Sequence, residues 1–176
     1  MRRIVQILLV LVIASAAFYF GILIQTCSKI IPVQMQQVFF CPADNCAQAL
    51  IDQINNADSS IHIAIYSFTL DSISEALVNA HARGVEVKIV FEKTQISKYS
   101  QYEKMLESGI DVRKDSNPAY MHNKFAVIDG KIVITGSYNW SERASEKNDE
   151  NLLIISSEGL AEEYEKSFRK IFEMSI

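Results

Sequence analysis

The sequence predicts an α/β domain with a mixed β-sheet flanked by helices on both faces, preceded by an N-terminal transmembrane helix. Along residues 31–176, short apolar and β-branched runs alternate with amphipathic runs. The run from Ile61 to Tyr66 is almost wholly apolar, which is typical of a strand buried on both faces. Asp129 and Gly130 separate two further apolar runs, as in an antiparallel hairpin. The expected order, β-α-β-α-β-α-β-β-β-α, therefore combines parallel and antiparallel strands in one sheet.

Residues 1–30 are interpreted as a membrane anchor. Arg2 and Arg3 precede an apolar run from Ile4 to Ile24, which as a helix would extend about 30 Å, the thickness of a hydrocarbon core. The alternative is a signal peptide cleaved after Ala14-Ser15-Ala16. We favour the anchor because the apolar run continues well past that point. Either way, residues 31–176 are expected outside the cytoplasm, in a bacterium anchored at the inner membrane and facing the periplasm, or secreted after cleavage.

The first half of the domain is expected to alternate between strands and helices. A strand is expected near 37–40, and Asn45 is positioned to cap a helix over 46–56. The strand near 61–66 leads to a helix capped by Asp71 or Ser72 and ended by Gly84. A strand over 85–91 and a helix over 99–107 follow, the helix closed by a Ser-Gly pair.

The second half is expected to be richer in strands. A short strand near 110–113 precedes the hairpin strands at 124–128 and 131–135. A turn or short helix over 140–144 and a loop over 145–149 lead to a last strand at 152–155. A final helix over 160–172 is amphipathic, with large apolar residues spaced to face the core.

The hairpin brings four polar side chains together. If Asp129 and Gly130 form a two-residue turn, Ile128 pairs with Lys131 and His122 lies opposite Ser137. The side chains expected on one face are then His122, Lys124, Ser137 and Asn139. An imidazole, an ammonium, a hydroxyl and a carboxamide suit a phosphate group, with the imidazole as nucleophile or acid and base. The alternative is a surface hairpin whose polar face is merely solvated.

The spacing of these residues resembles the HxKxxxxDxxxxxxGSxN signature of the phospholipase D superfamily, without a departure. The matching residues are His122, Lys124, Asp129, Gly136, Ser137 and Asn139. The resemblance extends from about Val33 to the C-terminus and is strongest to small bacterial Nuc-type nucleases, which carry one such motif per chain. The stretches AIYSFT at 64–69 and NDENL at 148–152 match the same subgroup.

The resemblance implies a two-step mechanism through a covalent phosphohistidine. In it His122 is the nucleophile, Lys124 and Asn139 stabilise the phosphoryl oxygens, and Ser137 orients the site. Glu150 is the candidate to hold the second ring nitrogen of His122, the alternative being a solvated loop acid. Because one chain supplies one such histidine, single-motif members are understood as homodimers in which the second copy protonates the leaving group.

The remaining residues near the motif have less direct roles. Asp129 lies in the turn, far along the strand from the histidine, and is assigned to turn and interface structure, while Gly136 is counted as a structural residue of the motif. Tyr120 and Trp140 flank the hairpin and are candidates to stack on bases, with packing in the core as the alternative.

Cys41 and Cys46 are expected to form a disulfide. The intervening residues favour a turn, and an oxidising compartment favours the bond, the alternative being two reduced thiols. Zinc is not expected, because His62 and His81 have no metal-like spacing to this pair and are interpreted as structural or exposed. No cofactor and no Mg²⁺ cluster are expected, so activity should survive EDTA.

The charge balance limits the class of partner. Leaving out Arg2, Arg3 and Lys29, 14 basic residues face 21 acidic ones, a net formal charge of −7. A nucleic-acid enzyme of this charge must rely on a local basic groove. We expect a metal-independent endonuclease for single-stranded DNA, with RNA also open. The alternatives are a phospholipase D-type lipid hydrolase with a cardiolipin-like substrate and, from another class, a catalytically idle nucleic-acid-binding module.

Overall fold

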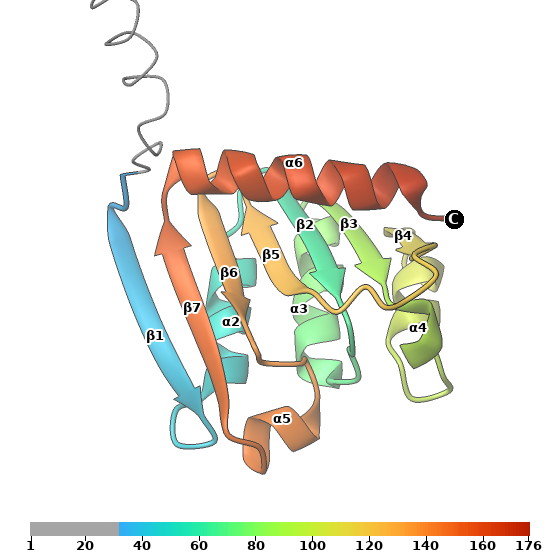
Figure 1. Cartoon of the computed structure of the whole chain (residues 1–176), viewed down its shortest axis with the longest axis horizontal. Helices are drawn as coiled ribbons and strands as arrows, with labels where there is room; N and C mark the ends of the chain where they lie inside the picture. The colour runs from blue at the N-terminus through green and yellow to red at the C-terminus, as the bar shows by residue number, and fades with distance from the viewer. Residues whose placement is uncertain (1–31) are drawn as a thin grey trace, which may run out of the picture. The chain divides into compact units, whose positions relative to one another are not determined.

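A mixed seven-stranded sheet in the order β1-β7-β6-β5-β2-β3-β4 forms the centre of the domain (Figure 1). The computed structural model describes residues 32–176, so the expected anchor or signal peptide lies outside the described residues. Strands β2, β3 and β4 are parallel, and all other neighbours are antiparallel. The mixed sheet is therefore confirmed. Within residues 32–176, no helix combines the length and apolar character needed to cross a bilayer.

The elements follow the expected order closely. The strands are β1 (Met35–Cys41), β2 (Ser60–Ile65), β3 (Glu86–Phe91), β4 (Asp111–Lys114), β5 (Lys124–Ile128), β6 (Ile132–Gly136) and β7 (Glu150–Ser156). The helices are α2 (Cys46–Asn55), α3 (Asp71–Ala82), α4 (Tyr102–Glu107), α5 (Glu142–Glu146) and α6 (Glu158–Met174), with a 3₁₀ turn at Lys93–Gln95. The main difference is α4, which begins three residues later than expected.

Helices cover both faces of the sheet. In Figure 1, α6 crosses in front of the strands, while α2 and α3 lie behind them. The core on the α2 and α3 face contains Leu50, Leu77 and Ile63, and the core under α6 contains Val127 and Phe168. The apolar run of β2 is buried on both faces, as its sequence predicts.

His62 lies on the face of β2 that α6 covers, and its role there is structural. Its ring stacks on Phe168, with centroids 4.9 Å apart. Nδ1 lies 2.8 Å from Glu165 Oε1 and Nε2 lies 3.1 Å from Glu86 Oε1. Burial lowers the pKa of this imidazole, but the hydrogen bonds and charges of the two carboxylates outweigh burial, so the pKa is raised.

The two expected helix caps had different outcomes. The Asn45 side chain accepts a hydrogen bond from the backbone N–H of Gln48 at 3.1 Å, as predicted for the start of α2. The prediction for α3 was wrong, because its N-cap is Leu70, which makes no side-chain cap bond. Asp71 lies in the first turn instead, where its carboxylate accepts from Gln101 Nε2 at 3.0 Å.

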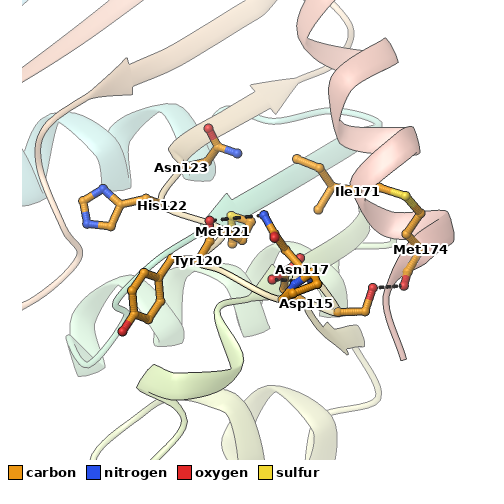
Figure 2. Close-up of a pocket in the computed structure, with 10 residues that line it drawn as sticks. Asp115, Asn117, Tyr120, Met121, His122, Asn123, Ile171 and Met174 are labelled. Atoms are coloured by element: carbon orange, nitrogen blue, oxygen red, sulfur yellow. Dashed lines mark hydrogen bonds between the residues drawn. The ribbon is translucent and has the colours of Figure 1, made fainter.

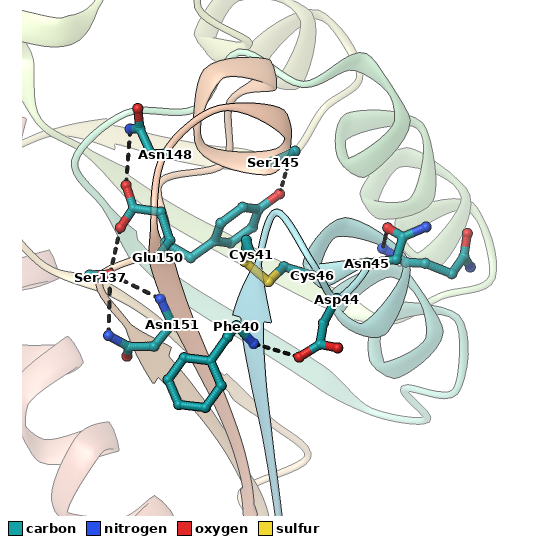
Figure 3. The surroundings of a disulfide bond; sticks show 12 residues. Phe40, Cys41, Asp44, Asn45, Cys46, Ser137, Ser145, Asn148, Glu150 and Asn151 are labelled. Carbon is teal, nitrogen blue, oxygen red and sulfur yellow. Dashed lines mark hydrogen bonds between the residues drawn. A yellow bond between two sulfur atoms is a disulfide. The ribbon is translucent and has the colours of Figure 1, made fainter.

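Cys41 and Cys46 are joined by a disulfide, as Figure 3 shows. Cys41 is the last residue of β1 and Cys46 the first of α2, with Cα atoms 6.0 Å apart. Both residues are buried. The bond fixes the end of β1 to the start of α2, and Cys41 pairs in register with Glu150 of β7.

Candidate active site

The signature residues other than Asp129 gather at one end of the sheet because neighbouring strands alternate in direction there. His122 lies two residues before the start of β5, Ser137 and Asn139 follow β6, and Glu150 begins β7. Antiparallel pairing of β5 with β6 and of β6 with β7 brings these three chain positions to the same end. The carboxyl ends of β2 and β3 meet there too, because β2 runs antiparallel to β5.

The hairpin register differs by one residue from the expected one. Asp129 and Gly130 form the turn with φ of 54° and 62°, and Lys131 N donates to Ile128 O at 3.0 Å, as predicted. Lys131 is nevertheless an extra residue, so Ile128 pairs with Ile132 and not with Lys131. The expected opposition of His122 and Ser137 was therefore wrong as a strand pairing, since both residues lie outside the strands.

The backbone departs from regular strand geometry at Gly136, the last residue of β6. Gly136 has φ of +153°, and a Cβ placed on it would lie 2.2 Å from the Asn151 carbonyl oxygen. The N–H groups of Ser137 and Tyr138 both donate to that oxygen, at 3.1 and 3.3 Å. The regular ladder ends here, and Ser137 leaves the alternation of the strand.

His122 and Lys124 contact each other and share Tyr66 as a support. Lys124 Nζ lies 3.0 Å from His122 Nδ1 and donates to the His122 carbonyl oxygen at 2.8 Å. The ring of Tyr66 lies 4.2 Å from the imidazole and 4.7 Å from Nζ, measured from its centroid. This arrangement holds a histidine and a cation side by side at the surface.

Glu150 binds Ser137 and not His122. Its Oε2 accepts from Ser137 Oγ at 2.5 Å, and its Oε1 accepts from Asn148 Nδ2 at 3.1 Å (Figure 3). Asn151 completes the cluster by donating its backbone and side-chain N–H groups to Ser137 Oγ, at 3.1 and 3.3 Å. No hydrogen bond joins Glu150 to the ring of His122 within the single chain, so the expected role of Glu150 stays a prediction.

One pocket collects the candidate catalytic groups. It is lined by His122, Lys124, Gly136, Ser137, Asn139 and Glu150. Burial of the Lys124 ammonium lowers its pKa, and the nearby charge of Glu150 partly opposes that effect. Oδ1 of Asn139 is buried without a hydrogen-bond partner among the described residues. A polar pocket with a cation and an unpartnered amide oxygen has groups that a polar ligand can bind.

The two aromatic candidates differ in exposure. Trp140 is only 1% exposed, and its ring packs edge-on against Phe68 at 5.1 Å, so base stacking by Trp140 was the wrong interpretation. Its backbone instead ties the segment after β6 to residues 67–70. Tyr120 is 61% exposed and is available to contact a ligand.

A second pocket shares His122 with the first, and Figure 2 shows the residues that line it. Tyr120 and Asn123 lie beside the histidine at its rim, and Ile171 and Met174 of α6 line the other side. Its lining contains no lysine or arginine. The first pocket contains the Lys124 ammonium, whereas the second contains the acidic Asp115, and His122 lines both.

Asp129 lies at the opposite end of β5 from the pocket. Its carboxylate accepts from the backbone N–H groups of Asp58, Ser59 and Ser60 at 2.7–3.0 Å, and from the Ser59 hydroxyl at 2.8 Å. Burial raises the pKa of Asp129, but these donors outweigh it and the pKa is lowered. Asp129 therefore ties the hairpin turn to the start of β2 and makes no contact with the site.

Sequence reasoning assigned no role to Tyr66 or Glu92, which the structure places beside the site. Tyr66 lies within the AIYSFT stretch, directly after β2. Glu92 directly follows the buried strand β3, and an acidic residue at that point is a signal that could have been noticed. Within residues 32–176, no cluster of three His, Cys, Asp or Glu side chains is arranged to hold a metal ion.

Comparisons with known proteins agree on one family. Residues 50–172 match the family described as "Cardiolipin synthase, PLD-like domain". A mitochondrial cardiolipin hydrolase from Chlamydomonas reinhardtii is 34% identical over 125 residues, covering 70% of this chain and 56% of that protein. A phospholipase D from Rickettsia conorii is 39% identical over 126 residues, covering 71% and 63%. The chain thus spans less than two thirds of the length of these relatives.

A solved structure covers more of the fold. The phospholipase D family member Nuc from Salmonella typhimurium aligns with a TM-score of 0.77 and 33% identity. The match covers 81% of this chain and 96% of Nuc. All the signature residues, from His122 to Asn139, fall within the part of the chain that the family description matches.

Proposed function

Because this chain belongs to the phospholipase D superfamily, we propose that it hydrolyses phosphodiester bonds of nucleic acid, preferably single-stranded DNA, without a metal ion. The observation that carries the proposal is the single pocket in which His122 and Lys124 meet Ser137 and Asn139. This set pairs a nucleophile with a cation and neutral polar groups, which is what in-line attack on a phosphodiester requires.

The reaction is a double displacement at phosphorus. A ring nitrogen of neutral His122 attacks, the bond from phosphorus to the leaving oxygen breaks, and that oxygen takes a proton from a general acid. Water then attacks the phosphohistidine and gives its proton to the same group, now a base, which releases His122 and a phosphomonoester. Lys124 and Asn139 stabilise the charge on the phosphoryl oxygens, and Glu150 fixes Ser137 at the rim of the pocket.

The general acid in this scheme is His122 of a second copy of the chain. Of the other two histidines, His62 is held between carboxylates under α6 and His81 lies on α3, so neither is at the pocket. Edge strand β1 also supports a dimer, since it exposes Phe40 at 62% directly opposite Asn151. A two-fold axis beside the pocket would bring two imidazoles to one phosphate.

Nucleic acid is favoured over phospholipid by coverage. The chain accounts for 96% of Nuc but for only 56% of the cardiolipin hydrolase, so the lipid-acting relative has much sequence that this chain does not match. The lipid alternative remains because the relatives are named phospholipase D and cardiolipin hydrolase and because residues 1–30 read as a membrane anchor. We further propose that the domain works in the periplasm, which the Cys41–Cys46 disulfide supports.

Assays on three substrates, with one active-site variant and one control variant, test the proposal. Purified protein is assayed on circular single-stranded DNA, on a matched RNA, and on vesicles containing cardiolipin, in each case with EDTA present. We expect DNA cleavage that persists with EDTA and falls at least about 10³-fold in His122→Ala, with His81→Gln as the control histidine. Hydrolysis of cardiolipin without cleavage of either nucleic acid would replace nucleic acid by phospholipid as the proposed substrate. Undiminished activity of His122→Ala would refute the assignment of the active site.

Subunit mixing tests the shared site. If each active site needs two copies of His122, heterodimers of parent and His122→Ala are inactive, so activity after subunit exchange should follow the square of the parent fraction. A linear dependence would show that one chain completes the reaction alone.

A further inference from the structure

The backbone of His122 is held from both sides by the ends of two parallel strands. On one side, the N–H of Met121 donates to Glu92 Oε2 at 2.7 Å, and Glu92 directly follows β3. On the other side, the Asn123 carbonyl oxygen accepts from the N–H of Tyr66, directly after β2, at 2.8 Å. His122 is exposed and precedes the first residue of β5, so these two bonds fix where its backbone lies.

Glu92 is unusual because its carboxylate is fully buried, with 0% of the residue exposed. Oε1 accepts hydrogen bonds from the backbone N–H of Thr94 at 3.0 Å and from the Thr94 hydroxyl at 2.8 Å. Oε2 accepts the hydrogen bond from the N–H of Met121. Burial raises the pKa of Glu92, but these neutral donors outweigh burial and the pKa is lowered. The group is therefore ionised at neutral pH, although an ionised carboxylate is costly to remove from water.

We infer that Glu92 is a positioning residue of the active site, whose carboxylate ties the end of β3 to Met121 and thereby sets the position of His122. The inference rests on the proposed hydrolysis by His122. Glu92 touches no reacting atom, since its three donors are Thr94 and Met121 groups. It acts through one peptide unit, and a charge-assisted hydrogen bond of this kind is short and stiff.

The requirement is for a carboxylate and not merely for a side chain of this size. Both oxygens of Glu92 face backbone N–H groups, which can only donate. A carboxamide must direct its NH₂ at one of them, so Glu92→Gln loses one of the two links at nearly constant volume. Displacing a nucleophile by about 1 Å lowers turnover by roughly 100-fold.

The test compares Glu92→Gln with Glu165→Gln in the full chain. Glu165, on α6, is a partly buried acid that bonds His62, so its variant also loses a carboxylate contact but lies away from the pocket. We expect kcat on bis(p-nitrophenyl) phosphate to fall roughly 10- to 100-fold in Glu92→Gln with KM within about threefold, because Lys124 still holds the phosphate. Glu165→Gln should keep the parent kcat, with both variants assayed well below their melting temperatures.

A second readout does not depend on turnover. In the parent, the Met121 amide proton should resonate far downfield because of its 2.7 Å bond to a carboxylate, and it should move upfield in Glu92→Gln. An active parent with a Glu92→Gln kcat within twofold, or with an equal loss in Glu165→Gln, overturns this inference alone. A parent inactive on every phosphodiester overturns the proposed function as well.

Discussion

Reducing the Cys41–Cys46 disulfide should lower the stability of the domain by about 2 kcal/mol. The two cysteines are five positions apart, so the bond closes a loop of about six residues. The loss of chain entropy on closing a loop that short corresponds to about 2 kcal/mol at 25 °C. For a domain of this size, each kcal/mol shifts the melting temperature by about 2–4 °C, so reduction should lower it by roughly 4–8 °C.

The assay is a pair of thermal melts with and without dithiothreitol. A Cys27→Ser background leaves Cys41 and Cys46 as the only thiols, and titration of free thiols before each melt shows whether the pair is reduced. The matched control is Cys41→Ala/Cys46→Ala in the same background, whose melting temperature should not respond to the reductant. If the parent pair is fully reduced and the melting temperature changes by less than about 1 °C, the disulfide between β1 and α2 does not contribute about 2 kcal/mol to stability.

Four further outcomes are expected. His62→Gln should lower the melting temperature more near pH 5.5 than near pH 8, because a raised imidazole pKa contributes stability that is complete below about 6.5 and is lost as pH rises through the folded-state pKa; an equal loss at both pH values would contradict this. Gly136→Ala should cost about 2–4 kcal/mol, because its Cβ would meet the Asn151 carbonyl oxygen, and a near-parent melting curve would count against that. Asp129→Ala should cost on the order of 3 kcal/mol while leaving kcat of the folded enzyme within a few-fold, as melts and assays on one preparation would show. Chelation should not reduce cleavage, and restoration by Mg²⁺ of activity lost to EDTA would refute catalysis by His122 alone.

Much of the fold could be predicted from the sequence because local signals and tertiary packing agree. The Asp129-Gly130 turn, the apolar run of β2 and the Asn45 cap each specify their element from within a few residues. The cap of α3 was predicted wrongly because Gln101, thirty positions away, engages Asp71. Long-range partners of this kind leave no trace in the local pattern.

The site itself was predicted for a partly mistaken reason. The register that placed His122 opposite Ser137 was off by one, because Lys131 is an extra residue after the turn. Ser137 lines the pocket even so, directly after the departure from regular strand geometry at Gly136. Spacing predicted that His122, Lys124, Ser137 and Asn139 would lie together, whereas the hairpin register depends on pairing between strands that no short stretch of sequence specifies.

The contacts of Asp129 have a consequence for how signature matches should be weighed. The aspartate and the histidine of the motif lie at opposite ends of β5, and the aspartate accepts its hydrogen bonds from groups at the start of β2. If His122 catalyses the proposed hydrolysis, a homologue that kept Asp129 but lost His122 would fold normally and lack that activity, whereas one with the reverse pattern would keep the activity in a less stable fold. Counting the aspartate and the histidine equally as evidence of activity therefore combines fold stability with catalysis, which are independent properties. Relatives that have lost the proposed activity should be sought among sequences that retain the aspartate.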